Sequence, residues 1–201
     1  MKMTALDRVL LLLTGLLAAY QIVIGINDLS TLPIIAYTIA FGVLLIASLL
    51  MVILGFDVLD SPAVVIVATI IPLSLSTGLV WEHIPAWQMG YLVFATLGFL
   101  AVLLTRIFPM PGRLPTIVLA LVHGVAGLVI FILPIVMVLQ GQAAPGFALV
   151  GLGGALIGLG GLLLSFLKTG KPILSRERIL KILPGLLLLM TTCFVAGFYL
   201  A

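Results

Sequence analysis

The sequence predicts an all-α integral membrane protein, with seven transmembrane helices in a single bundle that covers residues 1–201. Two features of composition lead to this class: 64% of the residues are hydrophobic and only 7% are charged. Soluble domains carry about 25% charged residues, so a chain this apolar cannot cover itself with a surface that water wets. The distribution of its basic residues then sets the orientation of the bundle.

Seven apolar runs reach the length of about 20 residues that a transmembrane helix needs. In order, the connectors between them are NDLSTL, FDVLDS, HIPA, FPMPGRL, GQAAP and TGKPILSRER, in which charged residues, Pro, Gly, Asn or Asp interrupt the runs. The first run begins like a signal sequence, but it continues through Ile26, so we expect an uncleaved span. The expected spans are 8–27, 33–55, 62–82, 87–107, 115–139, 146–168 and 179–200.

Seven crossings place all nine Lys and Arg residues on the face that carries the N-terminus. The other face has only Asp28, Glu82 and His83 in its connectors. By the positive-inside rule the N-terminus is cytoplasmic and the C-terminus lies on the opposite face. We expect the cytoplasmic membrane of a bacterium or an archaeon.

The sixth span contains the strongest pattern, GLGGALIGLGGLLLS, in which small residues recur at intervals of three, four and seven. This spacing places them on one helix face, where a neighbouring backbone can approach closely. The face consists of Gly151, Gly154, Ala155, Gly158, Gly161 and Ser165. Its neighbour is either a helix of the same chain, a helix of a partner or a second copy, or a flat ligand such as a lipid tail, quinone or porphyrin.

A single histidine, His123, lies inside the fifth span. At 1.5 Å per residue it is roughly 12 Å beyond Pro115, well within a hydrocarbon layer of about 30 Å. A polar ionisable group at this depth is costly and suggests a role. Thr14, Ser48 and Thr69 fall at a similar depth in other spans.

Three hypotheses for His123 follow. It hydrogen-bonds a neighbouring hydroxyl or carbonyl and aligns the helices; or it is the axial ligand of a haem or a chlorophyll-type pigment, with Gly124 and Gly127 making room for the macrocycle; or it relays protons or contacts substrate in a carrier. No Asp, Glu, Lys or Arg lies deep in a span, which disfavours the last hypothesis.

The cytoplasmic side carries a basic cluster around the last connector. Each basic residue near an anionic membrane surface contributes about 1 kcal/mol of attraction. The cluster therefore predicts binding of anionic lipid headgroups, or docking of an acidic partner. Its residues are Lys168, Lys171, Arg176, Arg178 and Lys181.

Catalytic and metal-binding patterns are missing from the sequence. There is no G-x-S-x-G, no H-E-x-x-H and no pair of intramembrane aspartates, so we expect neither an enzyme nor a metal site. We expect no nucleic-acid partner. The sequence favours an auxiliary membrane subunit that packs against other membrane proteins, lipids or pigments through its glycine-rich face. The alternatives are a pigment-binding protein with His123 as ligand, and a small-molecule carrier.

Overall fold

The computed structural model describes residues 3–26, 29–108, 112–168 and 174–201, without the side chains of 162 and 165–168. Every regular element in these residues is a helix, which confirms the predicted fold class. The α-helices are α1 (Ala5–Ile24), α2 (Thr31–Leu54), α3 (Pro62–His83), α4 (Gln88–Ile107), α5 (Leu114–Leu139), α6 (Ala148–Lys168) and α7 (Arg176–Tyr199). Short 3-10 helices lie in the connectors, namely η1 (Phe56–Asp60), η2 (Pro85–Trp87) and η3 (Pro145–Phe147).

Six of these helices are long and apolar enough to cross a membrane. The described apolar part of the remaining one, Pro145–Gly161, is shorter. Large hydrophobic side chains on all seven helices face outward, among them Leu16 on α1, Leu97 on α4 and Leu159 on α6. An exterior of this kind fits a helical protein that is surrounded by lipid.

Two helices begin three residues earlier than the sequence predicts, and polar caps explain both differences. The Thr4 hydroxyl accepts a hydrogen bond from the Asp7 amide at 3.2 Å, and the Asp7 carboxylate accepts one from the Thr4 amide at 2.8 Å. This capping box starts α1 at Ala5, and Gly25 ends it with a φ of 64°. Likewise, the Ser175 hydroxyl accepts from the Arg178 amide, which starts α7 at Arg176.

Prolines mark helix starts less exactly than expected. Pro62 is the first residue of α3 and Pro115 the second of α5, whereas α2 begins at Thr31, two residues before Pro33. All three still lie in a first turn, where the missing amide leaves no hydrogen bond unmade. The predicted starts of the fourth and sixth spans, at 87 and 146, fall within η2 and η3, each of which leads directly into its α-helix.

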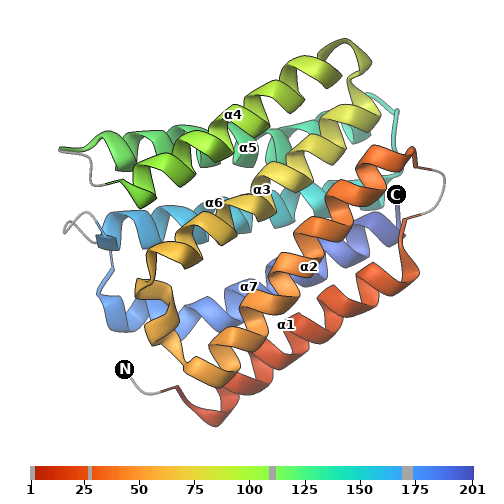
Figure 1. The fold of residues 1–201 in the computed structure, drawn as a ribbon. Helices are drawn as coiled ribbons and strands as arrows, with labels where there is room; N and C mark the ends of the chain where they lie inside the picture. The colour runs from red at the N-terminus through yellow and green to blue at the C-terminus, as the bar shows by residue number, and fades with distance from the viewer. Residues whose placement is uncertain (1–2, 27–28, 109–111, 169–173) are drawn as a thin grey trace.

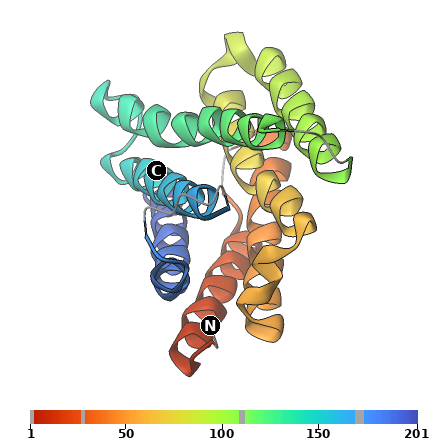
Figure 2. The ribbon, with the colours of Figure 1, turned by 90° about the vertical axis from the view of Figure 1, so that its left-hand side faces the viewer.

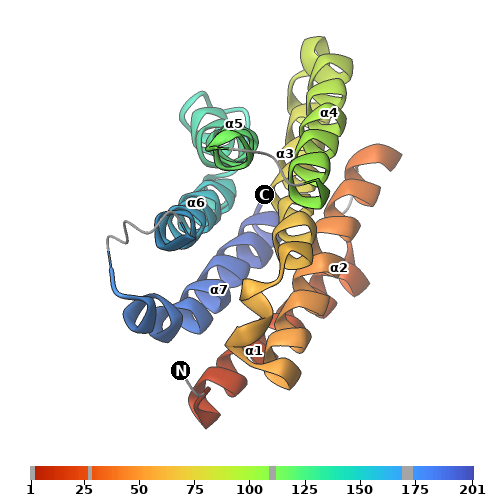
Figure 3. The same ribbon diagram turned by 60° about the vertical axis from the view of Figure 1, so that its left-hand side comes forward.

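Six helices form a closed ring, in the order α1, α2, α3, α5, α6, α7 and back to α1. The remaining helix, α4, packs outside the ring against α3 and α5 (Figures 1 and 3). The two chain ends lie at opposite ends of the bundle, as an odd number of crossings requires (Figure 1). Helices α5 and α6 lie side by side, and their axes cross the direction of α1 and α2 (Figure 2).

The main core fills the half of the ring nearer the C-terminus. Its centre is a chain of aromatic contacts in which Phe198 of α7 packs on Tyr37 of α2, with ring centroids 4.8 Å apart, and on Phe147 of η3, at 6.4 Å. The His83 ring lies 5.2 Å from that of Phe147. Because these rings come from four elements, they close the outer end of the bundle.

Candidate functional site: the glycine surfaces of α5 and α6

The predicted glycine face of α6 is divided in the structure, and two of its members contact α5. A Cβ added to Gly151 would lie 2.7 Å from the Phe131 carbonyl oxygen. One added to Gly154 would lie 2.8 Å from the carbonyl carbon of Ile130. Both glycines therefore let the α5 backbone approach within the same chain, and they are not free for a partner or a ligand.

The neighbouring glycines of α6 face α7. A Cβ on Gly153 would lie 2.6 Å from the Phe194 ring, and one on Gly160 would lie 2.8 Å from Leu186. Ala155 is half-buried. Much of the small-residue pattern thus serves the packing of α6 between its two neighbours in the ring.

Two members of the predicted face remain uncovered. Around Gly158 and Gly161, no described atom beyond the helix's own backbone lies within 4 Å of an added Cβ. Both residues are half-buried. The Ser165 side chain, which was expected on the same face, lies outside the described part of the structure.

The glycines flanking His123 on α5 are equally uncovered. Gly124 is exposed and Gly127 is half-buried, and an added Cβ on either would meet no described atom within 4 Å. Gly124 lies between Leu121 and Leu128, which are 60% and 57% exposed, so this part of α5 faces the lipid.

The uncovered glycines of the two helices lie at matching levels. Helices α5 and α6 are antiparallel, and Gly154 of α6 lies against Ile130 and Phe131 of α5. Gly158, one turn further along α6 toward the cytoplasm, is therefore level with Gly127 of α5. A further three residues bring Gly161 level with Gly124. We call these four residues, two on each of the adjacent helices, the open-glycine surface. The sequence analysis predicts a role for both pairs but does not relate their levels.

His123 is half-buried on α5, and its ring is held by its own helix. Its Nδ1 lies 3.2 Å from the carbonyl oxygen of Leu119, one turn earlier. Since a carbonyl only accepts, this hydrogen bond needs the proton on Nδ1, and in that neutral tautomer Nε2 keeps a lone pair. His123 thus has a carbonyl as its hydrogen-bond partner, as the first hypothesis expects. Because this carbonyl belongs to α5 itself, the bond does not align α5 with another helix.

The hydroxyl groups expected near the level of His123 do not bond to it. Thr14, Ser48 and Thr69 are fully buried, and so is Thr191 on α7. Each hydroxyl donates to a carbonyl of its own helix, at distances between 2.7 and 2.9 Å. Such bonds satisfy the donor locally, as is usual for Ser and Thr in apolar helices.

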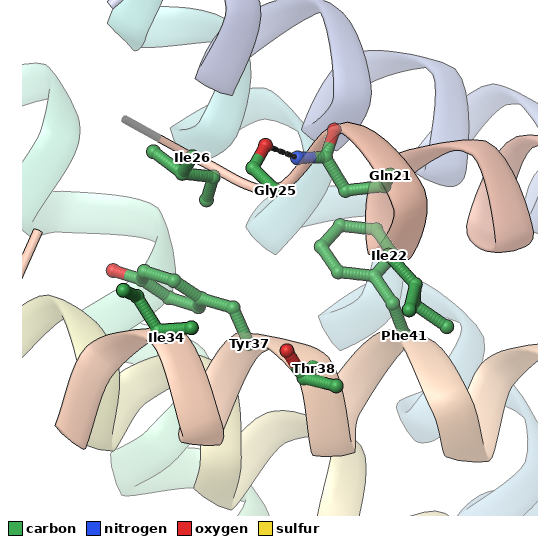
Figure 4. A pocket seen from close by; sticks show the side chains of 8 residues that line it. All are labelled: Gln21, Ile22, Gly25, Ile26, Ile34, Tyr37, Thr38 and Phe41. Atoms are coloured by element: carbon green, nitrogen blue, oxygen red, sulfur yellow. Dashed lines mark hydrogen bonds between the residues drawn. The ribbon is translucent and has the colours of Figure 1, made fainter. Parts of the chain in front are cut away.

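The cavities near the outer end are small or face the lipid. One of about 20 Å³ lies between α1 and α2, enough for a single water molecule (Figure 4). There the Gln21 side-chain amide donates to the Gly25 carbonyl at 2.9 Å. A groove of about 230 Å³ lies between α1 and α7, lined by Leu17, Tyr20, Thr192, Val195, Ala196 and Tyr199. Neither space favours the carrier hypothesis.

The predicted basic cluster is only partly described. Arg176 forms an ion pair with Asp60 of η1 at 2.7 Å, while Arg178 and Lys181 are exposed. Lys171 and the side chain of Lys168 lie outside the described residues. Among the residues that are described, no three His, Cys, Asp or Glu side chains gather as a metal site would require.

No family model matches the chain, and no curated protein and no solved structure is detectably similar to it. The class of the protein therefore rests on its own features, namely long apolar helices, a lipid-facing exterior and short connectors. These define a polytopic helical membrane protein.

Proposed function

We propose that the chain is an auxiliary membrane subunit that packs against a transmembrane helix of another protein. The observation that carries this proposal is the open-glycine surface, where two adjacent helices present backbone and no side chain among the described residues lies within 4 Å of an added Cβ. In this proposal the chain has no catalytic activity of its own. It resides in the cytoplasmic membrane of a bacterium or an archaeon.

Helix association in lipid supports a helix as the occupant. Lipid tails are as apolar as leucine, so helices associate through close van der Waals contact rather than through hydrophobic burial. Gly124 and Gly158 let a partner backbone approach closely enough for Cα–H contacts to carbonyl oxygens. The exposed Leu121, Leu128 and Leu159 would then pack along both sides of that helix.

Replacing Gly158 by Leu tests the proposal. We expect the variant to lose its partner when it is purified gently from its own membranes, because the side chain would fill the approach to the surface. The isolated chain should keep its thermal stability, since no described atom beyond the helix's own backbone lies within 4 Å of the added Cβ. Native mass spectrometry measures the bound polypeptide.

The matched control is Leu152→Phe, which adds bulk on the same helix at a side chain that is 48% exposed and takes no part in the proposed contact. This variant should retain the partner. Full retention by Gly158→Leu, or a wild-type chain that carries no polypeptide partner, would contradict the proposal.

A pigment-binding function is the second candidate, and the hydrogen bond of His123 favours it. Histidines that bind a metal through Nε2 usually donate Nδ1–H to a carbonyl or carboxylate, which fixes the tautomer. His123 has this arrangement with Leu119, and Gly124 and Gly127 leave space beside it. A haem or a chlorophyll-type pigment would receive its axial ligand there.

His123→Ala is expected to abolish a visible absorption band of the protein purified from its own membranes, while the helical circular dichroism is unchanged. His83→Ala is the control, because His83 lies at the outer end of the bundle against Phe147. A wild-type protein without a visible band, or a band that survives in the His123 variant, would exclude this candidate.

A further inference from the structure

The first helix ends beside the interior of α2, well below the outer end of that helix. Gly25, which follows the last residue of α1, lines the same cavity as Thr38 of α2 (Figure 4). Thr38 lies seven residues beyond the start of α2 at Thr31, roughly 10 Å along the helix axis. The last carbonyl groups of α1, which its own helix cannot satisfy, are therefore placed within the bundle and need other donors.

A buried glutamine serves this helix end. The Gly25 amide donates to the Gln21 carbonyl at 3.0 Å, and the Gln21 side-chain Nε2 donates to the Gly25 carbonyl at 2.9 Å. Gln21 is 3% exposed, and its Nε2 carries a second N–H. Burying an amide is costly unless its groups are hydrogen-bonded, so a small polar ligand beside this side chain would be bound favourably.

The Thr38 hydroxyl differs from other hydroxyls of the bundle. Thr14 and Thr96, for example, each donate to the carbonyl four residues earlier in the same helix. Among the described residues Thr38 makes no such bond, and Figure 4 shows its hydroxyl pointing from α2 toward the space that α1 bounds on the other side. Because lipid chains offer no hydrogen bond, a hydroxyl at this depth needs a partner from the protein or from ordered water.

We propose that the cavity between α1 and α2 binds one water molecule, held by the Thr38 hydroxyl on one side and the Gln21 side-chain amide on the other. The cavity of about 20 Å³ admits a single water molecule and excludes larger ligands. The second N–H of Gln21 donates to the water oxygen, and the Thr38 hydroxyl can accept from the water or donate to it. This water supports the early end of α1, and the site does not depend on the proposed function.

Solid-state NMR of the isotope-labelled full chain in phosphatidylcholine vesicles tests the proposal. Magnetisation transfer from water to the side-chain amide of Gln21 should give a signal in the wild type. Thr38→Val keeps the shape of the side chain but removes the hydroxyl, so it should lose most of this signal. Thr38→Ser keeps the hydroxyl and should retain the signal.

Thr96→Val is the matched control, because the Thr96 hydroxyl is satisfied by the Leu92 carbonyl at 2.9 Å and lies on α4. It should leave the Gln21 signal unchanged. Thr38→Ala, which also lacks the hydroxyl, should behave like Thr38→Val, and unchanged backbone shifts identify the variants that fold. A wild type without the signal, or a folded Thr38→Val or Thr38→Ala variant that keeps it in full, overturns the proposal.

Discussion

Gly154→Leu is expected to destabilise the bundle by about 3 kcal/mol or more, the upper end of the cost of overpacking a core. The reason is that the new side chain would meet the backbone of α5, at the carbonyl carbon of Ile130 and the amide of Phe131, both 2.8 Å from the added Cβ. A backbone inside a packed helix cannot move aside as a flexible side chain can. The α5–α6 contact would have to open.

Gly158→Leu is the internal comparison, because it changes the same residue type one turn along the same face. Its side chain meets open space, and leaving glycine improves helix propensity by up to about 1 kcal/mol, so the isolated chain should be as stable as wild type or slightly more stable. Unfolding in sodium dodecyl sulfate, followed by circular dichroism, measures both variants. Equal loss of stability in the two would mean that α6 packs differently from this description.

Phe194→Ala should have the second large effect, a loss of about 3 kcal/mol, at the low end of the range for buried Phe. Phe194 is 1% exposed, belongs to the main core and packs against Gly153. The low end is expected because an unfolded helix in a membrane still has its Phe in lipid, so the cost is lost packing and not transfer to water.

The same unfolding measurement applies to Leu189→Ala, on the same helix but 53% exposed. That control should change stability by less than about 0.5 kcal/mol, as surface substitutions usually do. If the two variants lost the same stability, the core would not be centred on α7 as described.

The sequence predicts the helices of this protein well because the bilayer imposes a length and excludes charge. The span at 62–82 differs from α3 by a single residue at its end. Larger differences occur at α1 and α7, where Thr4 and Ser175 cap helices whose first turns contain Asp7 and Arg178. The predicted spans exclude these two charged residues. In the structure the polar first turn at the membrane surface belongs to the helix.

The candidate site was less predictable, because it depends on which helices are neighbours. Spacing alone places Gly154 and Gly158 on one face, yet α5 covers the first and leaves the second open. The depth of His123 within its span could also be predicted from the sequence, whereas its hydrogen bond to Leu119 depends on a side-chain rotamer.

The ring also has a consequence for the order of events during synthesis. Because α1 contacts α7, α1 lacks one of its two neighbours in the ring until α7 has been synthesised. Phe194 and Phe198, at the centre of the core, lie on the same helix. A chain that stops before α7 would therefore persist as an open arc of inserted helices, exposed to membrane proteases.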